Sequence, residues 1–196
     1  MLVAVPRSDR LRVIVEHEIQ RLYQERYGAS LASFAPTIVA ELSRTRDVRC
    51  AAGIRFAHEP LFLECYLDRP IEEVLQDNLG TRVPRDRIVE VCHLAGAESG
   101  SSLTFVRKLT ALLHGIGAEW AIFTATEPLR LLLARRGLSM IELGKASVRR
   151  VSCPETWGSY FENDPRIMAV TRYSADEARL ATPLFVPSPA IDARVF

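Results

Sequence analysis

The stretch RIVEVCHLAGAESGSSLTFVRKLTALLHGIGAEWAIFTAT, residues 87–126, decides the fold class. Its first part, 87–95, is an apolar run typical of a buried strand, and the turn that follows contains two glycines. Residues 102–114 are predicted to form a helix and residues 119–126 a second strand. The apolar stripe of the helix is formed by Val106, Leu109 and Leu113. Strands and helices alternate strictly from residue 87 to residue 148, which predicts an α/β fold with a parallel or mixed central sheet and helices packed on it.

The rest of the chain carries weaker signals. A helix over 11–28 follows two candidate capping residues, Ser8 and Asp9, and ends at Gly28, although its opening LRVIV also fits a short strand. The other predicted elements are a strand at 37–42, a hairpin of VRCAAGIRFA (48–57) and LFLECYL (61–67), helices at 68–80 and 127–136, and a strand at 139–151. The stretch WGSYFENDPRIMAV fits no element clearly. We expect one domain over residues 1–175 and an extended, proline-rich arm over 176–196.

The composition is that of an ordinary soluble globular protein. The chain has 196 residues, of which 48% are hydrophobic and 25% charged, and its formal net charge is +1. A net charge this small argues against a general nucleic-acid binder. The four cysteines form no CxxC pair, so neither a zinc site nor a redox motif is indicated and no metal is expected. No run approaches the ~18 apolar residues of a membrane span, and the apolar amino terminus is too short for a secretory signal, so we expect a cytoplasmic protein without a transmembrane segment.

A glutamate, Glu90, lies in the middle of the apolar strand 87–95. Regular alternation would place Ile88, Glu90, Cys92 and Leu94 on one face and Val89, Val91, His93 and Ala95 on the other. On that pattern Glu90 and His93 do not form a dyad, and His93 alone is more typical of a satisfied core group. A buried carboxylate has a raised pKa, which would suit a base that deprotonates an amine. The alternative is a buried ion pair with Arg55, which would lower the pKa of Glu90 instead.

Residues 87–136 resemble the acyl-binding half of the GNAT (N-acetyltransferase-like) fold. In that fold the pyrophosphate-binding loop reads roughly Arg/Gln-x-x-Gly-x-Gly/Ala. The corresponding run here is AESGSS, in which Gly100 matches, whereas Ala97 and Ser102 depart from the pattern. The departure favours a carrier-protein donor over coenzyme A.

Within that fold, residues 50–148 resemble the acyl-homoserine-lactone synthases. Their Glu-x-Ser-Arg-Phe strand is similar to EVCHL, where Glu90 matches the glutamate and His93 replaces the arginine. Their Arg-Leu-Leu element is similar to GIRFA, through Arg55, and their later basic-Gly pair is similar to ARRGL. The resemblance implies acyl transfer from an acyl carrier protein.

Over nearly its whole length the chain is identified as a member of the thermostable hemolysin family. The stretches that carry this resemblance are ECYLDRPIE, RVPRDRIVEVCHLA, WAIFTATEPLR and WGSYFENDPRIM. Members usually have Gly-Asn where this chain has Cys92-His93, which suggests a specialised member. The family name implies membrane lysis, whereas the fold implies acyl transfer, so two classes of function remain open.

Together the residues and the resemblance give a set of candidate site residues. Glu90 is the candidate catalytic base. Candidates for binding the acyl donor are His93, Leu94, Ala95, Gly100, Ser101, Ser102 and Thr124. Candidates for binding the amine substrate are Arg55, Glu64 and Trp157. The structural alternatives are an ion pair for Glu64 and a core position for Trp157.

The expected partners are an acyl carrier protein and a small-molecule amine. No tightly bound cofactor is implied, because the acyl thioester, on a carrier protein or on coenzyme A, is a co-substrate. The paired basic residues at 107–108, 135–136 and 149–150 would suit docking of an acidic carrier protein.

Overall fold

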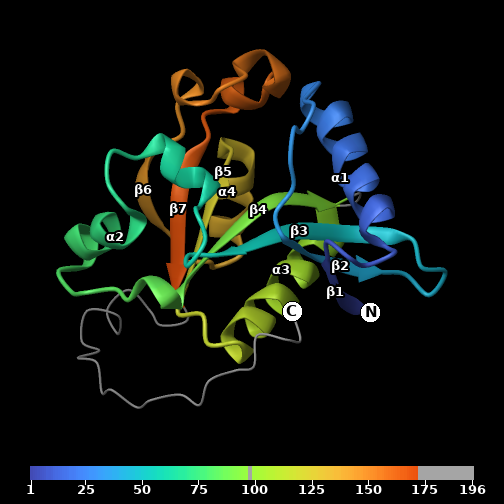
Figure 1. The fold of residues 1–196 in the computed structure, drawn as a ribbon, viewed down its shortest axis with the longest axis horizontal. Helices are drawn as coiled ribbons and strands as arrows, with labels where there is room; N and C mark the ends of the chain where they lie inside the picture. The colour runs from blue at the N-terminus through green and yellow to red at the C-terminus, as the bar shows by residue number, and fades with distance from the viewer. Residues whose placement is uncertain (97–98, 172–196) are drawn as a thin grey trace.

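A seven-stranded mixed sheet forms the centre of the molecule (Figure 1). The structure is a computed structural model that describes residues 1–96 and 99–171, with the side chains of 99–103 left out. The strands are β1 Leu2–Pro6, β2 Thr37–Leu42, β3 Val48–Phe56, β4 Ile88–Gly96, β5 Trp120–Ala125, β6 Ile141–Lys145 and β7 Arg166–Thr171. Their order is β1-β2-β3-β4-β5-β7-β6, and β4 and β5 form the parallel pair, while every other neighbouring pair is antiparallel. The predicted α/β class with a mixed sheet is confirmed.

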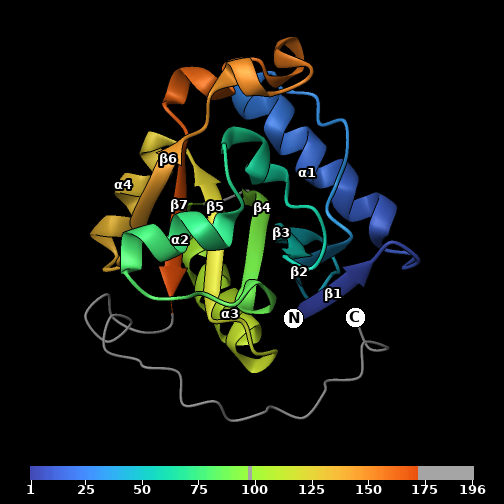
Figure 2. The ribbon, with the colours of Figure 1, turned by 60° about the vertical axis from the view of Figure 1, so that its left-hand side comes forward.

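Helices cover both faces of the sheet. They are α1 Arg12–Tyr27, α2 Ile71–Leu79, α3 Ser99–Gly115 and α4 Glu127–Arg135. Short 3-10 turns are η1 Phe62–Tyr66, η2 Arg85–Arg87, η3 Val148–Arg150, η4 Pro154–Trp157 and η5 Tyr160–Asn163. α1 and α2 pack on one face, and α3 and α4 on the other (Figures 1 and 2). The turns η4 and η5 lie beside the carboxyl end of α1 (Figure 2).

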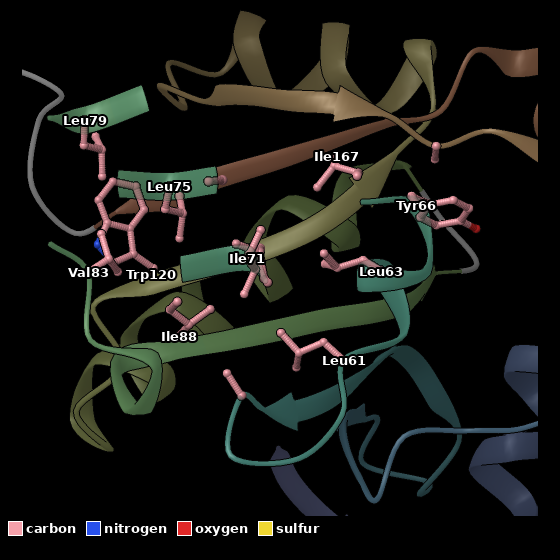
Figure 3. Packing of buried hydrophobic residues seen from close by; sticks show 14 residues of the cluster. Leu61, Leu63, Tyr66, Ile71, Leu75, Leu79, Val83, Ile88, Trp120 and Ile167 are labelled. Atoms are coloured by element: carbon pink, nitrogen blue, oxygen red, sulfur yellow. The ribbon is translucent and has the colours of Figure 1, made fainter. Parts of the chain in front are cut away.

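The largest apolar core lies under α2. Ile71, Leu75 and Leu79 recur at i, i+4 and i+8 and turn one stripe of α2 towards the sheet, where they meet Ile88 and Trp120 (Figure 3). Figure 3 also shows Tyr66 at the edge of this cluster, with its hydroxyl pointing away from the aliphatic side chains. This core therefore fixes η1 and its tyrosine against the sheet.

The predicted hairpin is wrong in its second half. LFLECYL contains the 3-10 turn η1 and not a strand, and β3 pairs instead with β2 and β4. The reason is that the N–H groups of Phe62 and Leu63 donate to the carboxylate of Glu90, which holds the turn in place of a strand ladder.

Two strands were not predicted, and one predicted strand is shorter. β1 is formed by the amino terminus, and β7 lies in the stretch that fits no element from sequence alone. β6 ends at Lys145, and 148–150 form η3. The LRVIV segment is helical from Arg12, so the helix alternative holds there. The arm over 176–196 lies outside the described residues.

Candidate active site at the opening between β4 and β5

Strands β4 and β5 separate at their carboxyl ends. Their parallel pairing runs from Ile88 opposite Trp120 to Val91 opposite Phe123. β4 then continues to Gly96 and β5 to Ala125 without pairing to each other. A cavity of about 700 Å³ lies at this opening, and side chains from both faces of the sheet line it. The cavity therefore passes between the two strands.

One end of the cavity is aliphatic. Its wall is formed by α3, α4 and the segment after α4, with Val106, Leu109, Leu113, Leu129, Leu132, Leu133 and Leu138. Leu109, Leu113 and Leu133 are each only 4% exposed, so the wall is part of the core between these helices and the sheet. An apolar channel of this kind suits a hydrocarbon chain.

The other end of the cavity is aromatic. Its rings come from α1, η1, η4 and η5, and they are Tyr23, Tyr27, Phe62, Tyr66, Trp157 and Tyr160. The centroids of the Tyr27 and Tyr160 rings lie 5.2 Å apart, and those of Trp157 and Tyr160 lie 5.3 Å apart. The rings therefore pack against one another and form a continuous wall.

Glu90 also lines the cavity, and it is 2% exposed. Its Oε2 accepts the N–H of Phe62 at 2.9 Å and its Oε1 accepts the N–H of Leu63 at 3.0 Å. Burial raises the pKa of Glu90 above its ordinary value, and the two N–H groups and the Arg55 guanidinium oppose the rise. The carboxylate thus has two roles available to it: it anchors η1, and its raised pKa suits a base.

Arg55 reaches Glu90 only loosely. Its Nη1 lies 3.9 Å from Oε2 of Glu90 and donates to the carbonyl of Pro60 at 3.4 Å. The pair with Arg55 is therefore present, but it does not lower the pKa of Glu90 as the ion-pair alternative expects, because burial has the larger effect.

The strand β4 is not regular, so the predicted orientation of His93 is wrong. His93 has a φ of +51°, and the register with β3 shifts from Cys92 opposite Gly53 to Ala95 opposite Ala51. This bulge inserts one residue and reverses the alternation beyond it. His93 consequently points to the same side as Cys92, with its ring centroid 6.3 Å from that of Tyr23 and 5.5 Å from that of Phe34.

His93 is a neutral group in this environment. Burial lowers its pKa to about 4, and the charges of Arg55 and Arg12 add to the effect. Its Nδ1 has no hydrogen-bond partner in the part of the chain that the structure describes. Gly53 leaves the space for this arrangement, because a Cβ there would lie 2.8 Å from Cys92 Sγ and 3.3 Å from His93 Nδ1.

The other predicted donor-binding residues are partly brought together. His93, Leu94 and Thr124 line the cavity. Ala95, which follows the bulge in β4, does not line the cavity and is buried against α1. Gly100, Ser101 and Ser102 lie in the first turn of α3, and nothing is described of their side chains. The first two residues of the AESGSS loop lie outside the described residues.

Only one of the three predicted amine-binding residues lines the cavity. Trp157 lines the cavity, whereas Arg55 and Glu64 do not. The carboxylate of Glu64 accepts from both Nη atoms of Arg85, at 2.6 and 2.9 Å, and from the N–H of Ile71 at 3.0 Å. Glu64 thus joins η1 to the start of α2 and the segment before β4, as the ion-pair alternative expects.

Sequence reasoning missed most of the aromatic wall. Tyr23, Tyr27 and Tyr66 are not among the residues that the sequence singles out. The signal that pointed to this wall was the WGSY run, which supplies both Trp157 and Tyr160. Cys92 also lines the cavity, but burial raises the pKa of its thiol, so it is not activated as a nucleophile.

The mixed sheet with its opening between two parallel strands is a GNAT-like fold, and solved structures show the same architecture. LasI, an acyl-homoserine-lactone synthase, has 13% identity and a TM-score of 0.60, covering 96% of this chain and 98% of its own. BjaI, a CoA-dependent acyl-homoserine-lactone synthase solved with SAM and isopentyl-CoA, has 13% identity and a TM-score of 0.60, with coverages of 91% and 85%. FeeM, an N-acyl amino acid synthase from uncultured soil microbes, has 14% identity and a TM-score of 0.55, with coverages of 91% and 98%.

Comparison of the sequence with protein-family models shows the family to which the chain belongs. The model of the thermostable hemolysin family matches residues 5–175, and the chain belongs to that family. A search of curated proteins finds no match. Within residues 1–96 and 99–171, no helix is both long enough and apolar enough to cross a membrane.

Proposed function

We propose that this protein is an N-acyltransferase that moves an acyl group from a thioester to the amine of a small molecule. The observation that carries the proposal is the cavity at the opening between β4 and β5, whose lining combines the aliphatic side chains of α3 and α4, an aromatic wall and the buried carboxylate of Glu90. The likeness to LasI, BjaI and FeeM supports the proposal, because acyl synthases share this fold.

The acyl donor would enter at the opening of the sheet. Its hydrocarbon chain would lie along the leucines of α3 and α4, where burying each CH₂ stabilises the complex by about 0.8 kcal/mol. The thioester carbonyl would lie beside Cys92 to Gly96, the part of β4 that is not paired with β5, and backbone N–H groups there would stabilise the oxyanion. An acyl carrier protein is the proposed donor and coenzyme A the alternative.

The basic residues offer modest support for a carrier protein. Lys108 pairs with Glu41 and Arg150 with Asp68, so these two cations are already neutralised. Arg107, Arg135, Arg136 and Arg149 are exposed and take part in no salt bridge among the described residues. An acidic carrier could be steered by these four arginines.

The transfer step would use Glu90 as the base. The amine nitrogen attacks the thioester carbon and forms the C–N bond, Glu90 takes the proton from the nitrogen, and the C–S bond breaks as the tetrahedral intermediate collapses. The leaving thiolate then receives a proton, so the products are an amide and a free thiol. Each oxygen of Glu90 keeps a second lone pair beyond its bond to η1, which leaves room for the proton.

The raised pKa of Glu90 gives a pH test with a defined sign. The folded state holds the proton of Glu90 more tightly than an unfolded chain, in which the glutamate pKa is near 4.5. The contribution of Glu90 to stability is therefore present at low pH and is lost as the pH rises from about 4.5 through the folded pKa. Activity should show the opposite trend, because only the ionised carboxylate acts as a base.

The experiment measures thiol release from acyl-carrier-protein and acyl-coenzyme A thioesters of several chain lengths, with mixed amines as acceptors. We expect acceptor-dependent release by the wild type, with an acidic limb in its pH profile. Glu90→Gln should lower the rate by about 10²–10⁴-fold and abolish that limb. Glu155→Gln, an exposed residue near the same end of the molecule, is the matched control.

Glu90 also anchors η1, so unfolding by urea is measured for the same variants. Full activity of Glu90→Gln with an unchanged pH profile would refute the role of base. No thiol release from any donor, together with dye release from liposomes lacking thioester, would favour the lytic function that the family name implies.

A further inference from the structure

The WGSY run, residues 157–160, is clamped against the end of α1. The N–H of Ser159 donates to the carbonyl of Tyr27 at 2.8 Å, and the N–H of Ser30 donates to the carbonyl of Thr156 at 2.7 Å. Gly158 has a φ of +50°, and a Cβ there would lie 1.9 Å from the oxygen of Tyr27. Only glycine permits this close approach, and the approach sets Trp157 and Tyr160 against the tyrosines of α1.

The resulting aromatic pocket has unused polar groups. The hydroxyls of Tyr23, Tyr66 and Tyr160 make no hydrogen bond within the described residues. Burial raises the pKa of all three phenols, so they remain neutral donors at physiological pH. Aromatic rings with unpaired hydroxyls suit a ligand that is itself aromatic and carries polar substituents.

The charge at this end of the cavity is positive at the rim. Arg26, in the last turn of α1, lines the cavity and lies 5.4 Å above the Tyr27 ring. It is exposed and belongs to no salt bridge in the described ranges. Two carboxylates line the cavity, Glu127 at the start of α4 and the buried Glu90, each of whose oxygens already accepts one N–H of η1. Arg26 therefore gives the aromatic end a cation that an anionic group of a ligand could pair with.

We propose that the acyl acceptor is an α-amino acid with an aromatic side chain. Its ring would lie against Trp157 and the tyrosines, its carboxylate would pair with Arg26, and its amine would face Glu90 and the thioester. This inference rests on the proposed function and adds the class of acceptor. It also assigns a role to the WGSY run, because that run supplies Trp157 and Tyr160, against which the aromatic ring of the acceptor would stack.

The experiment compares acceptors that differ by one group. Phenylalanine and tyrosine are compared with phenethylamine and tyramine, which lack the carboxylate, and with alanine and leucine, which lack the ring. Putrescine, which lacks both groups, is also tested. Acylated products are identified by mass spectrometry, and binding of each acceptor is measured separately by calorimetry, which needs no turnover. We expect phenylalanine or tyrosine to exceed every other group about tenfold or more in kcat/KM, as one charge-assisted contact implies.

Two variants separate the roles of charge and ring. Arg26→Gln should raise KM about tenfold for phenylalanine and leave KM for phenethylamine within about twofold. Trp157→Leu should weaken the binding of phenylalanine and of phenethylamine to a similar degree, because both molecules carry the aromatic ring. Arg10→Gln, an exposed arginine before α1, is the control and should change neither.

The outcomes distinguish this inference from the proposed function. Thiol release with leucine or putrescine as the best acceptor would refute the aromatic amino acid and leave the acyltransferase intact. An equal effect of Arg26→Gln on phenylalanine and phenethylamine would refute the role of Arg26. Absence of thiol release with every acceptor would refute the proposed acyltransferase function. If phenylalanine and tyrosine also failed to bind in calorimetry, the proposed acceptor site in the aromatic pocket would be refuted as well.

Discussion

The two ends of the cavity are built in different ways. The aliphatic end comes from two helices that are consecutive along the chain, α3 and α4, and its lining is made of flexible branched side chains. The aromatic end brings together α1, η1 and the turns η4 and η5, which lie far apart in sequence. Backbone hydrogen bonds and a glycine without space for a Cβ hold these segments together.

This difference has a consequence for specificity. Leucine side chains can change rotamer and accept hydrocarbon chains of several lengths at small cost. Aromatic rings that pack on one another fix a single shape, so a change in one segment disturbs the whole wall. We therefore expect a tolerant donor end and a selective acceptor end, and substitutions at each end should affect one substrate and not the other.

The largest effect is expected from Gly158→Ala. The new Cβ would clash with the carbonyl of Tyr27 and would also require a positive φ, so we expect a loss of roughly 2–4 kcal/mol in the free energy of unfolding. Urea denaturation measures the loss, and KM for the acceptor should rise more than KM for the donor.

Gly115→Ala is the matched control for this substitution. Gly115 lies at the end of α3, and a Cβ there would meet no atom within 4 Å. It should be neutral or stabilise the protein by up to about 1 kcal/mol. Equal stability of the two variants would show that the contact between the WGSY run and α1 is not needed.

A smaller effect is expected at the aliphatic end from Leu132→Trp. Leu132 is half-buried and lines the cavity, so a larger ring there would shorten the channel. We expect kcat/KM for the longest acyl chains to fall about tenfold, while short-chain donors and acceptor KM stay within about twofold. Ala134→Trp, on the exposed side of the same helix, is the control. A uniform loss across all chain lengths would contradict a channel at α3 and α4.

The strands β4 and β5 and the helices α3 and α4 could be predicted from sequence because their signals are local. The alternation over 87–148 and the stripe of α3 depend on neighbouring residues, and both correspond to observed elements. The glycine stops after α1 and α2 likewise have the left-handed conformation that ends a helix. These features are specified by residues that are close along the chain.

The aromatic end and the course of β4 beyond Cys92 could not be predicted, because their causes are long-range. LFLECYL has the composition of a strand, yet Glu90, far along the chain, accepts the N–H groups that a strand would pair. Likewise, nothing in EVCHL signals that a bulge at His93 reverses the alternation, since the space for it comes from Gly53 on the neighbouring strand. In both cases tertiary contacts override the local pattern.

The smallest effect is expected from Glu64→Gln, which compares the two glutamates that were candidates for the site. Glu64 lies outside the cavity and holds Arg85 through both oxygens, with its side chain 22% exposed. Because this pair is partly solvated, we expect its loss to cost about 1 kcal/mol in urea denaturation, with kcat and both KM values unchanged within about twofold. Glu90→Gln should instead reduce kcat far more than stability. If Glu64→Gln raised KM for the acceptor by tenfold without loss of stability, the acceptor would bind at η1 and Arg85, and the aromatic pocket would not be the selective end.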